Sequence, residues 1–356
     1  MTTLTIPETT LRTRDEAPAR RASSPWLVDP WFDALFLANV GWPLLFAGLL
    51  WCGPALHDGV RFWQVYFVTA THRWITLPLV FLDRERFRER PVAFTSLAAL
   101  AVLVCVGVRL STGALTCLLT IDYLWNAWHF ASQHAGIGRI YARQSGAGTR
   151  RASLEKLLMR GFLLYVILRM SGLEWALLGD GLGALGISAE TWTPERLEAA
   201  LQRLDWVCLA ALLPLAGVVW PKAGDAARGR VLYLASCLSL YASILVAVHV
   251  HRFDLVVLLA TLSALFHAVE YLAIVSWAVH QRRPVERPAL RDLLSAVVPR
   301  WGHAVFGFAL ALAAIGWLAD QQGLEFWLLL NLVAAFLHYA YDGLIWKRRS
   351  PRMPVT

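Results

Sequence analysis

Apolar residues dominate ten stretches of this chain, and each stretch is close to the length that crosses a membrane as a helix. The hydrocarbon core of a bilayer is about 30 Å thick, which a helix of ~20 residues spans. The pattern therefore predicts an all-α fold, a polytopic membrane helix bundle with about ten transmembrane helices. The approximate limits are 31–52, 61–82, 92–111, 114–137, 155–178, 203–220, 230–249, 255–279, 302–319 and 324–346.

The connections between these stretches fall into two sets that alternate along the chain. One set is rich in Arg and Lys, whereas the other, which includes 179–202, holds few of either. Basic connections of multi-pass proteins face the cytoplasm. We therefore expect both termini to be cytoplasmic and the protein to lie in a bacterial cytoplasmic (inner) membrane. The basic set comprises Arg84, Arg86, Arg88, Arg90, Arg139, Arg143, Arg150, Arg151, Lys222, Arg228, Arg230, Arg282, Arg283, Arg287, Arg291, Lys347, Arg348 and Arg349.

The polar ends complete the predicted organisation. Residues 1–28 are rich in Pro, Thr and Arg and lack the apolar core of a signal peptide, as is typical of a disordered tail. We expect a disordered cytosolic tail at 1–28, a single transmembrane helical domain at 29–348 and a cytosolic tail at 349–356.

Composition agrees with a membrane protein. Hydrophobic residues make up 57% of the chain and charged residues 16%, and the mean hydropathy is +0.50. The net charge of +8 comes mostly from Arg in short connections. We therefore expect contact with membrane lipids and no binding of nucleic acid. The five cysteines are scattered without a CxxC pair, which argues against a disulfide framework.

Four histidines lie deep inside the apolar stretches. His72, His129, His267 and His338 fall on the second, fourth, eighth and tenth stretches, which all run in the same direction under the predicted topology. Their depths agree within a few residues, at the midplane or in its cytoplasmic half. Ionisable groups are costly inside a membrane and are usually paired, liganded or functional.

Helical periodicity adds more polar residues to the faces that carry these histidines. His134 is turned about 100° from the face of the fourth stretch. Because lipid-facing polar stripes are costly, we expect the four faces to converge on one site. The faces are His72 with Thr76; Asp122, Asn126, His129 and Gln133; Ser263, His267, Glu270 and Tyr271; and Asn331, His338 and Asp342.

Mixed imidazole and carboxylate groups at this depth are typical ligands of a transition metal. We expect Asn126 and Gln133 to orient the ligands, and Arg73 to lie at the cofactor with Glu270 or Asp342 as its partner. Glu270, Asp342 and Tyr271 are the expected catalytic groups. The competing interpretation is an interhelical hydrogen-bond network that only packs the bundle. The expected metal ligands are His72, His129, His134, His267, His338, Glu270 and Asp342.

The predicted arrangement, in which several membrane helices each bring a histidine to one site, resembles that of integral-membrane non-haem iron enzymes. Fatty-acid desaturases and alkane hydroxylases are examples of these enzymes. The arrangement also resembles that of the bacterial membrane β-carotene cleavage oxygenases. The spacings here are His129–His134, His267–Glu270 and His338–Asp342, and the HxxxH and HxxHH boxes of desaturases are missing. The resemblance implies an iron site within the membrane, near its cytosolic side.

We therefore expect a metal-dependent membrane oxidoreductase, with non-haem iron, mono- or dinuclear, acting on a lipophilic small molecule. The reaction would be hydroxylation, desaturation or oxidative cleavage, with electrons from a cytosolic ferredoxin or reductase. Copper and haem b are the alternative cofactors. A b-type haem electron-transfer protein, a metal-free membrane transferase and a proton-coupled transporter are the rival functions. His57, His249 and His251 lie near the opposite ends of their stretches and are expected to be solvated. The alternative for these three, with Asp58 and Asp254, is a second metal site or a proton-entry site.

Overall fold

The computed structural model describes residues 24–146, 148–172, 194–219, 227–281, 297–323 and 325–346. Every regular element within these ranges is a helix, which confirms the predicted all-α class. The predicted tail at 349–356 lies outside the described residues, as do residues 1–23. The elements are α1 (Pro30–Phe32), η1 (Asp33–Leu37), α2 (Trp42–Cys52), α3 (Pro54–Phe62), η2 (Trp63–Thr69), α4 (Ala70–Trp74), α5 (Thr76–Phe81), α6 (Arg84–Glu89), α7 (Pro91–Thr112), α8 (Thr116–Gln144), α9 (Thr149–Ser171), α11 (Pro194–Val219), α12 (Arg228–His249), α13 (Phe253–His280), η4 (Val298–Arg300), α15 (Trp301–Gln321) and α16 (Glu325–Ile345).

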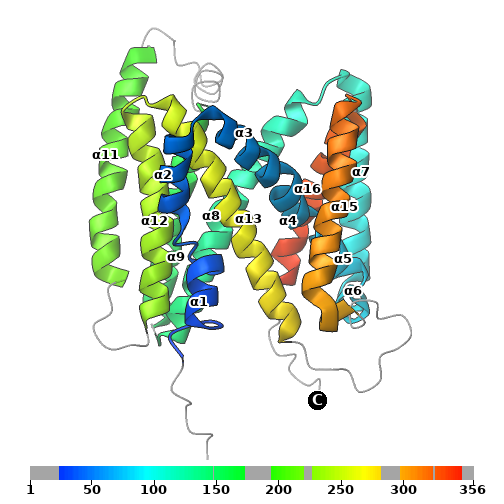
Figure 1. Ribbon diagram of the computed structural model, residues 1–356, viewed down its shortest axis with the longest axis horizontal. Coiled ribbons are helices and arrows are strands. Elements are labelled where there is room, and N and C mark those ends of the chain that lie inside the picture. Colours follow the sequence, from blue (N-terminus) through cyan, green and yellow to red (C-terminus); the bar gives the residue numbers. More distant parts are fainter. Residues whose placement is uncertain are drawn as a thin grey trace, which may run out of the picture.

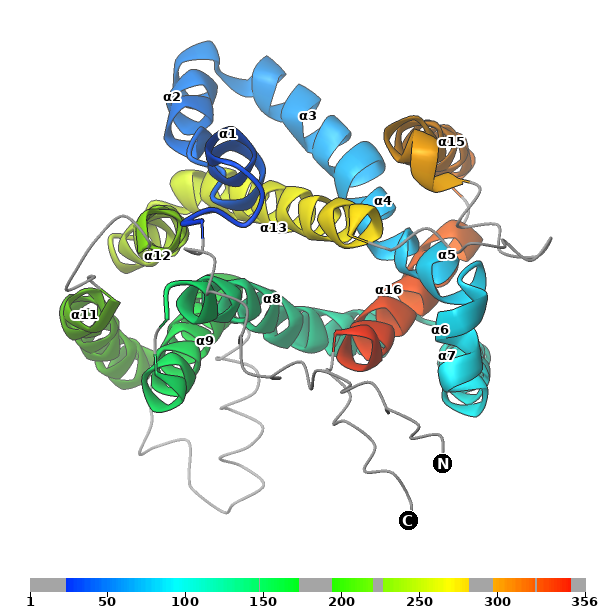
Figure 2. The same cartoon turned by 90° about the horizontal axis from the view of Figure 1, so that it is seen from below.

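The helices gather in two groups joined by two oblique helices. Figure 1 shows α2, α9, α11 and α12 on one side and α5, α7, α15 and α16 on the other. Helices α8 and α13 run obliquely from the first group toward the second, and the view from below in Figure 2 shows both between the groups. They therefore carry side chains from the first group into contact with the second.

Six helices among the described residues are long and apolar enough to cross a membrane: α7, α11, α12, α13, α15 and α16. A seventh span arises if Pro30–Leu37 and Trp42–Cys52, which meet at 45°, form one broken span. The remaining predicted stretches, 61–82, 114–137 and 155–178, are helical over most of their length but do not meet the same criteria.

Burial separates the inner helices from the outer ones. In the apolar windows of α12 and α13, 56% of residues are buried, against 11% in α7. The uncovered face of α7 includes Leu100, Leu103 and Leu110, each more than half exposed. An apolar surface this extensive is typical of a protein that contacts lipid rather than water.

The second predicted stretch is a chain of short elements rather than one helix. The π-helix η2 joins α3 to α4, and inside it Gln64 Nε2 donates a hydrogen bond to Thr69 Oγ1 over 2.5 Å. A further break follows at Ile75, between α4 and α5. Pro78 lacks the N–H that would bond to the carbonyl of Trp74, so a helix break one turn before it is expected. The two interruptions leave His72 on its own five-residue helix.

The described structure begins inside the predicted N-terminal tail. The backbone N–H groups of Leu27 and Val28 donate to the Asp33 carboxylate over 2.6 and 3.0 Å. The hydroxyl of Tyr141, near the end of α8, donates to the same carboxylate over 2.6 Å. The last residues of the segment 1–28 are therefore attached to the helix bundle.

Candidate metal centre

Four helices bring five histidines and two carboxylates together. Short helix α4 supplies His72, α8 supplies His129 and His134, α13 supplies His267 and Glu270, and α16 supplies His338 and Asp342. The five histidines and Glu270 are each at most 7% exposed. The polar faces predicted on the second, fourth, eighth and tenth stretches thus converge at the junction of the two helix groups.

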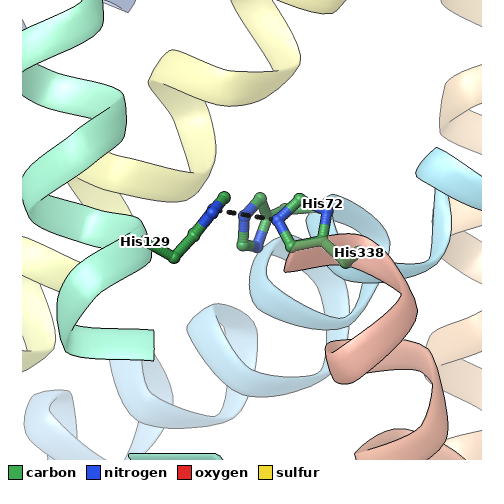
Figure 3. A group of neighbouring side chains, drawn as sticks. All are labelled: His72, His129 and His338. Carbon is green, nitrogen blue, oxygen red and sulfur yellow. Dashed lines mark hydrogen bonds between the residues drawn. The ribbon is translucent and has the colours of Figure 1, made fainter. Parts of the chain in front are cut away.

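Three of the histidines form one possible ligand set, called here the three-histidine group: His72, His129 and His338. One ring nitrogen from each lies within 4.8 Å of the others. Nε2 of His338 is 3.0 Å from Nε2 of His129, a contact drawn as the dashed line in Figure 3, with His72 beside it. Oδ2 of Asp342 lies farther off, 3.9 Å from His338 Nε2 and 4.0 Å from His129 Nε2.

The second set is called here the glutamate group and consists of His134, His267 and Glu270. Its donor atoms also lie within 4.8 Å of one another, and all three side chains are fully buried. Nδ1 of His134 is 3.0 Å from Oε2 of Glu270. Two imidazoles with one carboxylate are the ligand set of many non-haem iron oxygenases.

His267 connects the two groups. Its ring centroid lies 4.8 Å from that of His72, 5.1 Å from that of His129 and 5.6 Å from that of His134. The ring of Phe130 stacks on it at 3.7 Å. The stacked phenyl ring limits rotation of the imidazole, so its edge stays directed at the histidines around it.

Five imidazole nitrogens in the cluster have no hydrogen-bond partner among the described residues. They are both nitrogens of His72, both nitrogens of His267 and Nε2 of His134. A buried polar group left unpaired costs about 1–3 kcal/mol. Five of them rival the roughly 5–15 kcal/mol that stabilises a whole protein. Metal coordination would occupy the one lone-pair nitrogen that a neutral imidazole offers in His72 and in His267, and would so remove part of this cost.

The hydrogen-bond directions around Asp342 determine the tautomer of His338. The carboxylate accepts from the Tyr271 hydroxyl at 2.7 Å. The Tyr271 oxygen then accepts from Thr76, 2.9 Å away, and the Thr76 oxygen accepts from His338 Nδ1 at 2.7 Å. Nδ1 of His338 therefore carries the proton, and Nε2 keeps its lone pair directed into the three-histidine group. Orientation of a ligand histidine by a hydrogen bond from its other nitrogen is the usual arrangement at metal sites.

Glu270 is also held by residues that do not belong to the ligand sets. Gln133 Nε2 donates to Oε2 of Glu270 over 2.7 Å and to the backbone oxygen of His267 over 2.9 Å. The hydroxyl of Tyr233 on α12 donates to Oε1 of Glu270 over 2.5 Å. Gln133 was predicted at the site, whereas Tyr233 was missed because its stretch, 230–249, carries no histidine or carboxylate before its last residue that would have pointed to the site.

Arg73 and Asn126 lie at the edge of the cluster, in a different arrangement from the one expected. Arg73 Nη2 is 3.7 Å from Asp122 Oδ2, so the partner is neither Glu270 nor Asp342. The Tyr339 hydroxyl donates to Asp122 and to Asn126, each over 3.0 Å. The expectation erred because Asp122, two turns before His129 on α8, lies on the side of that helix facing Arg73. Asn126 was expected to orient a metal ligand, and its side-chain oxygen accepts the hydrogen bond from Tyr339.

The outer histidines have partners of their own, away from the cluster. His57 Nε2 lies 2.9 Å from the backbone oxygen of Leu49, His249 Nδ1 lies 3.3 Å from Asp205 Oδ2, and His251 Nε2 lies 3.1 Å from Gln202. These separate contacts do not form one site.

Comparison of the chain with models of protein families, with curated proteins and with solved structures finds no match.

Proposed function

We propose that this protein is a metal-dependent membrane oxidoreductase that uses non-haem iron to oxidise a lipophilic substrate. The observation that carries the proposal is the buried cluster of five imidazoles, five of whose nitrogens are unpaired among the described residues, beside two carboxylates. A packing network of the same residues would leave those nitrogens unpaired at a considerable cost in free energy.

The donor set supports iron among the transition metals. Imidazole binds zinc, copper, iron and nickel, and two imidazoles with one carboxylate are typical of non-haem iron oxygenases. The glutamate group has that composition. Bound iron would supply the redox chemistry, in which a C–H bond, O₂, two electrons and two protons give an alcohol and water.

The protein's own residues would orient ligands, exclude water and handle protons. Gln133 and Tyr233 fix the Glu270 carboxylate, and Thr76 fixes His338. The Asp342 side chain is 11% exposed and accepts from Tyr271, so this pair can pass a proton between the edge of the protein and Thr76. Complete burial of His267 and Glu270 keeps bulk water away from the reacting atoms.

A cavity beside α13, one of the four helices that carry the cluster, is the proposed place of substrate entry. It has a volume of about 400 Å³ and lies between α2, α3 and α13, within the range of small-molecule sites. Its wall combines apolar side chains, among them Leu49, Val257 and Leu258, with the ionisable side chains of His57, Asp58, Arg61 and Asp254. Thr261, at one edge, is six residues before His267 on α13, about 9 Å along the helix.

The proposed function includes the membrane topology predicted from the sequence. Ten spans, cytoplasmic termini and a bacterial inner membrane would place the basic connections on the cytosolic face. A ferredoxin or reductase with an acidic surface would dock there and deliver electrons, because complementary charge steers such encounters.

The packing of the rings favours non-haem metal over haem b. The ring of His72 has His338 at 4.5 Å, His267 at 4.8 Å and Tyr271 at 5.0 Å between centroids. Side chains therefore occupy the space that a porphyrin would need between two axial histidines.

Elemental analysis after anaerobic purification in detergent tests the metal, with His267→Ala and His280→Ala beside the wild type. His280 is an exposed histidine on the same helix as His267. We expect iron in the wild type and in His280→Ala, at least a twofold loss in His267→Ala, and no Soret band. Metal-free wild type, or equal iron in all three proteins, would overturn the proposal.

The oxidoreductase activity is tested by O₂ uptake in membranes supplied with reduced ferredoxin and a lipid extract. Uptake by the wild type above that of His267→Ala is expected. Equal uptake by both would reject the oxidase chemistry even if iron is bound.

A further inference from the structure

We infer that the cluster holds two metal ions in chemically unlike sites, one in the three-histidine group and one in the glutamate group. The inference rests on the proposed function for the presence of metal, and it concerns the number of ions and their ligands. It assigns one ion to three imidazoles and the other to two imidazoles and a carboxylate.

The number of donors is the first argument. Five imidazoles and Glu270 offer six side-chain donors in two sets, each compact to within 4.8 Å. Non-haem iron oxygenases hold the metal with two imidazoles and one carboxylate and keep the other positions open for reactants. Six protein donors on a single ion would leave little room for a reactant, whereas three on each of two ions leave open positions at both.

The spacing of the donors is the second argument. Two donors bound to one ion at about 2.0–2.1 Å lie about 2.9 Å apart at a right angle and about 3.3 Å apart at the tetrahedral angle. The 3.0 Å separation of His129 Nε2 and His338 Nε2 fits this range. The 3.0 Å separation of His134 Nδ1 and Glu270 Oε2 fits it as well. Each group therefore contains a pair of donors at a distance compatible with a shared ion, and the same separations also fit a direct hydrogen bond between the two side chains.

The unpaired nitrogens give a third argument, because each group contains at least one histidine with no other role. His72 in the three-histidine group and His267 in the glutamate group each have two nitrogens without a partner among the described residues. The two rings are neighbours at 4.8 Å. Two-metal sites commonly hold their ions about 3.5–4 Å apart, so adjacent ligand rings from two groups are compatible with such a pair.

The competing interpretation is that one ion occupies the histidines while His134 and Glu270 form a metal-free ion pair. The two interpretations differ in what Glu270 contributes. In the two-ion arrangement Glu270 is a ligand, and Glu270→Gln weakens one site. In the ion-pair arrangement the same change alters stability but leaves the metal content unchanged.

Titration of the metal-stripped wild type with Co²⁺ in detergent counts the sites without any mutation. The visible absorption of protein-bound Co²⁺ should rise to an end point of two equivalents per chain. An end point of one equivalent would overturn the two-ion inference and leave the proposed function intact. No binding at all would overturn both.

Two variants assign the sites. His72→Ala and Glu270→Gln are each expected to bind one equivalent, half of the wild-type value. Glu155→Gln is the matched control, because Glu155 is also a buried membrane glutamate but pairs with Arg230 away from the cluster; it should bind two. Elution as a monodisperse peak on size exclusion establishes that each variant folds. Two equivalents in folded Glu270→Gln would overturn the assignment of Glu270 as a ligand.

Discussion

Replacing Thr76 with valine removes one hydroxyl from the hydrogen-bond chain that orients His338, while the shape of the side chain is nearly kept. That hydroxyl lies 2.7 Å from Nδ1 of His338 and 2.9 Å from the Tyr271 hydroxyl, in a fully buried position. Valine pairs with neither group, and each buried polar group left unpaired costs about 1–3 kcal/mol. Because the Tyr271 hydroxyl keeps its hydrogen bond to Asp342, the change leaves mainly Nδ1 of His338 unpaired, and we expect Thr76→Val to lower the free energy of unfolding by about 1–3 kcal/mol.

The same change should weaken metal binding, because Thr76 keeps the proton of His338 on Nδ1. Loss of the hydrogen-bond partner of a ligand histidine typically weakens binding about 10–100-fold. This corresponds to about 1.4–2.8 kcal/mol. Competition against a coloured chelator measures the dissociation constant of the purified protein in detergent.

Two controls make the result specific to the hydroxyl at this position. Thr76→Ser keeps the hydroxyl and should retain wild-type affinity. Thr95→Val removes a hydroxyl from an exposed threonine on α7, whose only bonds are to backbone oxygens of its own helix, and should have no effect. An affinity of Thr76→Val within twofold of the wild type would refute the role assigned to Thr76, as would a Ser variant as weak as the Val variant.

Three further outcomes are expected. Arg73→Met should lower the thermal midpoint in detergent, because the Asp122 carboxylate loses its opposite charge. Adding Asp122→Asn should restore part of the midpoint, and a double variant less stable than Arg73→Met would contradict the pairing. Gly316→Ala should destabilise by about 1–3 kcal/mol, because the new Cβ would lie 2.9 Å from the ring of Trp327. Gly107→Ala meets no atom within 4 Å and should be neutral or stabilising in the same melting experiment; equal effects would refute the close approach of α15 and α16. Stripping the metal with a membrane-permeable chelator should lower the thermal midpoint, since an ion at 100 times its dissociation constant contributes about 2.7 kcal/mol, and a midpoint unchanged on metal removal would contradict coordination in the folded state.

Hydropathy and helical periodicity predicted the class of fold and the four helices that build the site. The prediction of convergence worked because His267 and Glu270 fall on the same side of a continuous helix, as do His338 and Asp342, and neither face can be left in lipid at low cost. Periodicity specifies the side of a helix on which a residue lies. Periodicity was therefore enough to predict that these residues form one cluster.

The same reasoning could not assign partners within the cluster. Which neighbour a face meets depends on the crossing of helices, so Arg73 was expected beside Glu270 or Asp342 and lies beside Asp122 instead. His134 is turned away from the face of His129, yet it reaches Glu270 because the oblique α13 passes along α8. Tyr233 was missed for a related reason: its contact with Glu270 arises from the packing of α12 on α13, which no pattern within α12 indicates.

The π-helix η2 has a consequence for how mutations in this chain would act at a distance. Each residue of an α-helix turns the chain by about 100°, and η2 ends at Thr69, three residues before His72. Deleting one residue within Trp63–Thr69 would convert the wide turn to an ordinary one and change the rotational phase between α3 and α4. Either His72 on α4 would rotate away from the other imidazoles, or the residues of α3 that line the cavity would rotate out of it. The length of this one segment thus couples the direction of a ligand to the shape of the cavity, although no side chain of η2 belongs to the cluster.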